Sequence, residues 1–133
     1  MTEHHPLQHI VAIAAGGAVG AIGRHLVNLA CSRFLGSHFA FGTLAVNVVG
    51  CFLLGLLIPL GTAEIPRWGG LTHSALTVGF LGALTTFSTF GLETARCFEN
   101  AQHGLALVNI AANVLLGISA VYGGLLIGRV LAA

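Results

Sequence analysis

The chain has 133 residues, of which 56% are hydrophobic and only 7% are charged, and its formal net charge is +1. A soluble domain carries roughly 25% charged residues, so five arginines and four glutamates cannot cover a water-exposed surface of this size. The composition predicts an integral membrane protein and excludes a basic surface for nucleic acid.

Four apolar windows are each long enough to cross the ~30 Å hydrocarbon core of a bilayer. They cover residues 10–30, 41–60, 71–98 and 105–129, and the short segments between them hold most of the charge. Lipid offers the backbone no hydrogen bonds, so each window predicts a helix. We expect an all-α integral membrane protein whose four transmembrane helices form one domain over residues 1–133. The polar start MTEHHPLQHI lacks the basic segment of a signal peptide, so we expect the first helix to be retained.

The first window carries small residues and one arginine. Gly16 and Gly20 stand four residues apart, a spacing that lets helices approach closely in a bilayer. Arg24 follows one turn later, and the window contains neither Asp nor Glu. Close packing of this helix against a neighbour is the prediction.

The second window carries a polar stripe. Thr43, Asn47, Cys51 and Gly55 recur every four residues, which puts them on one face of a helix. Polar groups inside a membrane tend to face a pore, a cavity or a partner. Asn47 is therefore either a pore-lining amide or a hydrogen-bonding contact between helices.

The third window contains the unusual segment GFLGALTTFSTFGLE, residues 79–93. Its glycines are weak helix formers and its hydroxyl groups compete for backbone hydrogen bonds. A break between about Gly82 and Thr86 is predicted, and carbonyls freed at such a break can coordinate an alkali cation. The alternative is an unbroken helix whose hydroxyls bond the preceding turn. Phe87 and Phe90 share one face after the break.

The fourth window repeats the pattern of the second. Asn109, Asn113 and Gly117 recur every four residues, and Gly124 and Gly128 extend the run of small residues. The stripe predicts either a pore wall or polar contacts between helices.

The basic residues give almost no orientation signal. With four spans, Arg67 and Arg129 lie on one side of the membrane, whereas Arg33 and Arg96 lie on the other. Arg24 lies inside the first helix, nearer the side of Arg33 and Arg96. Because basic residues normally mark the cytoplasmic side, this almost even split favours a chain that inserts both ways and pairs antiparallel with itself.

Together these segments resemble the Fluc-type (CrcB family) fluoride ion channels. The resemblance is carried by GGAVGAIGRH at 16–25, GTLAVNVVGCFLLG at 42–55 and the third-window segment at 79–93. It implies a passive, fluoride-selective anion channel in a bacterial-type inner (plasma) membrane. Such a channel exports cytoplasmic fluoride, relieves fluoride toxicity, and works as an antiparallel dual-topology homodimer with a structural sodium ion at its centre.

The resemblance also implies roles for individual residues. Those expected to line the fluoride pore are Thr43, Asn47, Phe87, Phe90, Asn109 and Asn113. Arg24 and Glu93 are expected at a vestibule. The backbone carbonyls of Gly82 and Thr85 are expected to bind the sodium ion. The fourth helix departs from the family pattern, because Asn109, Asn113 and Gly117 stand where the family often has tyrosine and then serine or threonine.

Two other classes of protein fit the chain less well. A small four-helix proton-coupled exporter of the multidrug type depends on an acidic residue deep in its first helix, which is absent here. An enzyme is not expected, because the seven histidines are scattered without a catalytic or zinc-binding partner set. The histidines nearest the N-terminus, at positions 4, 5 and 9, could bind a metal at most weakly.

Overall fold

The computed structural model describes residues 6–63 and 66–133, and four helices account for nearly all of them. The first two are α1 (Pro6–Leu35) and α2 (Phe41–Thr62). The third consists of α3 (Gly70–Ser74), η1 (Ala75–Leu81), α4 (Gly82–Leu84) and α5 (Phe87–Glu99). The fourth consists of α6 (His103–Ala111), η2 (Ala112–Leu116) and α7 (Gly117–Ala132). The positions of His4 and His5 lie outside the described residues.

All four helices are long and apolar enough to cross a membrane. Each is longer than its predicted window; the first begins at Pro6 and ends at Leu35. The expectation of four apolar helices is confirmed. Few residues of these spans are buried inside the single chain, as befits helices whose outer surfaces face lipid.

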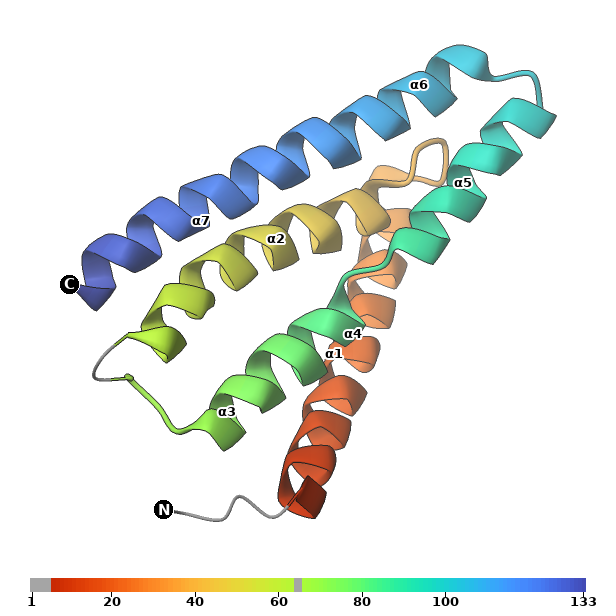
Figure 1. The fold of residues 1–133 in the computed structure, drawn as a ribbon. Coiled ribbons are helices and arrows are strands. Elements are labelled where there is room, and N and C mark those ends of the chain that lie inside the picture. The colour runs from red at the N-terminus through yellow and green to blue at the C-terminus, as the bar shows by residue number, and fades with distance from the viewer. Residues whose placement is uncertain (1–5, 64–65) are drawn as a thin grey trace.

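The helices run antiparallel and form two packed pairs. The start of α1, the end of α2, the start of α3 and the end of α7 gather at one end of the bundle (Figure 1). One pair is α2 with α7, and the other is α1 with η1 and α4. The last part of the third helix, α5, leaves α1 and packs on α6 instead.

Glycines make the tight seams of both pairs. A methyl group added at Gly124 would collide with the carbonyl oxygen of Phe52, and one at Gly55 would collide with that of Val121. In the other pair, a methyl group at Gly20 would collide with the carbonyl oxygen of Phe80. The predicted close approach of helix backbones is confirmed, and it explains why so many positions lack a side chain.

The third helix is broken near its middle, as predicted. Thr85 (φ −79°, ψ 154°) and Thr86 (φ −153°, ψ 115°) are extended, so α4 ends at Leu84 and α5 begins at Phe87. The break is narrower than expected, because Gly82 keeps helical angles (φ −62°, ψ −33°). The preceding turns, η1, have π-helical hydrogen bonding, a local widening that is often found at functional sites.

Candidate functional site

The site is built around the two extended residues of the third helix. Thr86 is the N-cap of α5: its Oγ1 accepts a hydrogen bond from the amide of Thr89 at 3.2 Å and donates to Thr89 Oγ1 at 3.0 Å. Threonine is a favoured N-cap because its oxygen satisfies one of the free amides of the first turn. The hydroxyl cluster of the sequence thus restarts the helix after the break.

Asn47 of α2 bridges the break with both ends of its amide. Its Oδ1 accepts from the backbone N–H of Thr86 at 2.8 Å, and its Nδ2 donates to the Thr86 carbonyl at 3.3 Å. In a continuous helix the Thr86 amide would bond the carbonyl of Gly82. Because that amide donates to Asn47 instead, the Gly82 carbonyl loses its usual helical partner.

A track of side-chain amides continues from Asn47 into the fourth helix. Asn47 Nδ2 donates to Asn113 Oδ1 at 2.9 Å. Asn113 Nδ2 then donates to Oδ1 and to the carbonyl of Asn109, each at 3.0 Å. Asn109 Nδ2 donates to Thr94 Oγ1 at 2.9 Å, and the Thr94 hydroxyl donates to the Phe90 carbonyl at 2.8 Å. We call this series of bonds the amide track.

A carboxylate lies beside the track. Thr43 is almost fully buried, and its hydroxyl donates to Glu93 Oε1 at 2.8 Å. The other oxygen, Oε2, is buried and has no hydrogen-bond partner among the described residues. Thr43 therefore orients one oxygen of Glu93 and leaves the second free to accept.

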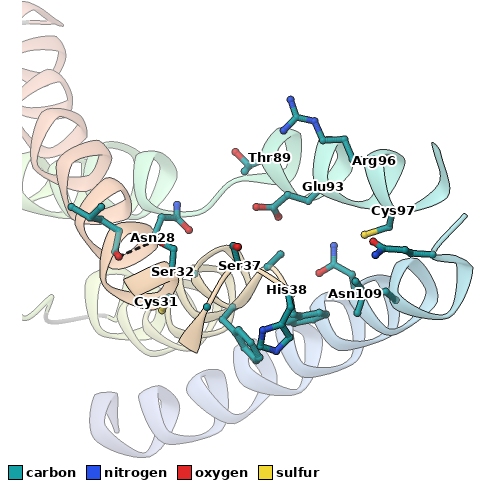
Figure 2. Close-up of a pocket in the computed structure, with 18 of the residues that line it drawn as sticks. Asn28, Cys31, Ser32, Ser37, His38, Thr89, Glu93, Arg96, Cys97 and Asn109 are labelled. Atoms are coloured by element: carbon teal, nitrogen blue, oxygen red, sulfur yellow. Dashed lines mark hydrogen bonds between the residues drawn. The ribbon is translucent and has the colours of Figure 1, made fainter. Parts of the chain in front are cut away.

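The amide track joins two cavities. The inner cavity, of about 310 Å³, lies at the break and brings together six of the predicted site residues: Asn47, Gly82, Thr85, Phe87, Phe90 and Asn113. The outer cavity, of about 560 Å³, lies between the end of α1, the connection to α2 and the end of α5. Figure 2 shows Glu93 and Asn109 directed into the outer cavity from facing helices. Asn109 and Asn113 bond each other, so the track runs from one cavity to the other.

The two aromatic residues of the break have opposite exposures. Phe87 is 82% exposed and Phe90 is 8% exposed. Their ring centroids lie 5.5 Å apart at an interplanar angle of 62°, an edge-to-face arrangement in which the positive edge of one ring meets the face of the other. Both line the inner cavity, so an anion there would have ring edges within reach.

Arg24 and Thr43 are the predicted site residues that line neither cavity. Thr43 contacts Glu93, which lines the outer cavity. Among the described residues, Arg24 has no such link to either cavity. It is a half-buried residue of α1, and the described residues that line the outer cavity include Arg96 instead. Sequence reasoning also missed Thr94, which ends the amide track, and Asn28, whose side chain occupies the space that a methyl group at Gly42 would need. The spacing of Thr94 four residues after Phe90 was the available signal, because it places both on one helical face.

The described parts of the chain offer no side-chain metal centre. Within residues 6–63 and 66–133, no three His, Cys, Asp or Glu side chains gather closely enough to hold a metal ion.

Comparisons with known proteins match most of the chain, and the relatives named below share one name. Residues 11–125 match a family model described as CrcB-like protein, Camphor Resistance (CrcB). A protein of Dehalococcoides mccartyi named "Fluoride-specific ion channel FluC" is 46% identical over 124 residues, covering 92% of this chain and 93% of the relative. A protein of the same name from Magnetococcus marinus is 44% identical, covering 90% of this chain and 96% of the relative. One from Caulobacter vibrioides is 41% identical, covering 92% and 97%.

Proposed function

This chain belongs to the CrcB family, and on that premise we propose that it is a passive channel selective for fluoride. It is a multi-pass membrane protein, and its relatives named as fluoride-specific ion channels cover nearly its whole length. The observation that carries the proposal is the amide track, a line of neutral hydrogen-bond donors between two cavities.

The chemistry of the track suits a small, strongly hydrated anion. A pore must replace the water lost by fluoride with donors, and amide N–H groups donate without a permanent charge that would trap the ion. The ring edges of Phe87 and Phe90, which both line the inner cavity, would add weak favourable contacts. A narrow track of this kind would discriminate against the larger chloride ion.

We propose that the direction of net flow is outward from the cell. HF crosses membranes as a neutral acid and dissociates in a less acidic cytosol, which leaves fluoride trapped inside. A membrane potential of about 100 mV, negative inside, drives a monovalent anion outward by about 2.3 kcal/mol. A passive pore therefore relieves fluoride toxicity without a second substrate.

The working unit that we propose is an antiparallel homodimer of dual topology. Arg67 and Arg129 lie at one end of the bundle, and Arg33 and Arg96 lie at the other. This balance removes the usual bias in orientation. The surface at the break supports a second copy, because Phe87 and Gly82 are exposed there and would be covered by a symmetry-related chain.

We further propose that a structural sodium ion lies between the two breaks. The Thr86 amide, the usual helical partner of the Gly82 carbonyl, donates to Asn47 instead. The Thr89 amide, the usual helical partner of the Thr85 carbonyl, donates to Thr86 Oγ1 instead. Carbonyls of Gly82 and Thr85 from two copies would offer four neutral oxygens. Oxygen ligands suit a hard alkali cation, and the ion would hold the two breaks together.

A proton-coupled exporter is not favoured. The curated relatives are named as ion channels, and α1 carries neither Asp nor Glu. The fluoride-specific name of the relatives also argues against an enzyme.

The deciding experiment is fluoride efflux from liposomes that contain the purified full chain. We expect rapid fluoride loss once a potassium ionophore clamps the membrane potential, and no comparable loss when the liposomes are loaded with chloride. Liposomes without protein give the background. Equal rates for both anions would contradict selectivity, and no efflux of either would contradict a channel.

A further inference from the structure

Counting donors along the amide track shows where the anion would meet it. Each asparagine amide has two N–H groups. Asn47 uses both, on Thr86 and Asn113, and Asn113 uses both, on Asn109. Asn109 uses one, on Thr94. Among the described residues the second N–H of Asn109 has no acceptor, and this side chain lines the outer cavity.

Thr94 fixes the direction in which the Asn109 amide points. Its hydroxyl hydrogen is donated to the Phe90 carbonyl at 2.8 Å, so the Thr94 oxygen faces Asn109 as an acceptor. Asn109 must then turn its nitrogen toward Thr94 and its oxygen toward Asn113, where it accepts at 3.0 Å. A flipped Asn109 would set its nitrogen against that of Asn113, and two donors would face each other.

On the premise of the proposed function, we propose that Thr94 is a positioning residue for fluoride conduction. Its oxygen is the acceptor that holds the Asn109 amide when no anion is present, and it is exchanged for the anion when fluoride arrives from the outer cavity. Fluoride first meets the unengaged N–H of Asn109. Each later step along the track is an exchange of acceptors, because the donor groups of Asn47 and Asn113 are engaged at rest.

This exchange sets how tightly the track holds fluoride. Asn109 is 2% exposed and Thr94 is 8% exposed, so the position of the lost acceptor is buried between the two helices and is poorly accessible to bulk water. A buried donor without an acceptor costs roughly five- to hundredfold in an equilibrium constant. Without the Thr94 oxygen, the fluoride-free channel would carry this free-energy cost. The fluoride-bound channel would not, because the anion would accept the hydrogen bond of Asn109. Fluoride would then bind more tightly and leave more slowly, whereas a pore needs both entry and exit.

The chain offers a matched control for the loss of a threonine hydroxyl. Thr62 also donates to the carbonyl four residues earlier, that of Ile58 at 2.9 Å. It is exposed at the end of α2, and among the described residues no amide of the track donates to it. Thr62→Val removes the same back-bond as Thr94→Val, so the two variants differ in the Asn109 contact.

The experiment measures initial fluoride efflux from proteoliposomes against the fluoride concentration inside. For Thr94→Val we expect the half-saturating concentration to fall by about fivefold or more, together with a lower maximal rate. Thr94→Ser keeps the hydroxyl and should restore both values, and Thr62→Val should match the unmodified chain. If the valine variant does not yield folded protein, Thr94→Ala removes the same acceptor with less bulk and carries the same expectation.

The outcomes separate this inference from the proposed function. A half-saturating concentration that stays unchanged or rises in the valine or alanine variant would overturn the role of Thr94, because a merely structural contact would lower the rate without tightening binding. Absence of fluoride efflux from the unmodified chain would instead overturn the channel itself.

Discussion

At the scale of single residues, Asn47 has the most demanding environment. Its oxygen accepts the Thr86 amide, and its nitrogen serves two acceptors, the Thr86 carbonyl and Asn113. The same side chain therefore holds the break of the third helix and begins the amide track. The predicted contact between helices is present, and the pore role of Asn47 stays a prediction.

The substitution Asn47→Asp tests this position. An aspartate has no N–H, so two acceptors would face a carboxylate oxygen, and a negative charge would stand in the path of an anion. We expect fluoride efflux from proteoliposomes to fall by at least about tenfold, since each unsatisfied buried group costs about 1–3 kcal/mol. Gln8→Glu, an amide-to-acid change at an exposed position of α1, is the control for added charge. Efflux near that of the unmodified chain would mean that Asn47 does not line the path.

At the scale of elements, the fold depends on seams where backbone meets backbone. Gly55 and Gly124 face each other's helices along the α2–α7 pair, and their missing side chains leave room for carbonyl groups. Such contact gains dispersion energy that lipid cannot match. The seam should therefore tolerate no added side chain.

Two neighbouring glycines of α7 test the seam. Gly124→Val would press against Phe52 and Leu56, where added atoms meet backbone, whereas Gly123→Val would meet nothing within 4 Å. Both changes alter helix propensity equally, so their difference reports packing. We expect the first to lower the free energy of unfolding in detergent by about 1–3 kcal/mol relative to the second, measured by thermal or denaturant unfolding. Similar free energies of unfolding for the two variants would show that α2 and α7 can separate at Gly124 without loss of stability.

The sequence predicted the helices and the break, but not the hydrogen bonds between helices. Hydrophobic length predicted four helices, and the run of hydroxyls after Gly82 predicted the break, because both are local properties. The transfer of the Thr86 amide to Asn47 depends on the rotation of α2 against the third helix, which no local pattern contains. The spacing of Thr94 from Phe90 is local, but the contact of Thr94 with Asn109 is not, because it requires α5 and α6 to pack together. The π-helical turns of η1 and η2 gave no sequence signal that we recognised.

At the scale of the whole molecule, the break of the third helix exposes an aromatic ring beside interrupted backbone. Phe87 is 82% exposed beside polar backbone, although most exposed apolar residues of this chain lie on regular helices that lipid can cover. Lipid cannot satisfy the free carbonyls of an interrupted helix. A second copy against this surface is the arrangement that we expect.

The antiparallel arrangement predicts that both orientations exist in one membrane. A tag after Ala133 should be accessible to a membrane-impermeant reagent in about half of the molecules on each side, because the four arginines at the helix ends and in the connections are divided equally between the two ends. Adding two lysines to the connection at residues 36–40 should bias the population to one orientation and reduce fluoride efflux. A single orientation in the unmodified chain would exclude the antiparallel dimer.

Replacing sodium by a large organic cation should also weaken the dimer if sodium binds at the breaks.

The hydrogen bond between the Thr86 amide and Asn47 has a consequence for the motions of the protein. Thr86 is 6% exposed, and its amide proton is held at 2.8 Å by a side chain of another helix. In a continuous helix, an amide proton exchanges with deuterium when its own helix opens locally. Here exchange also requires the Asn47 side chain to swing away. The exchange rate of this one backbone proton therefore records how often Asn47 releases the Thr86 amide.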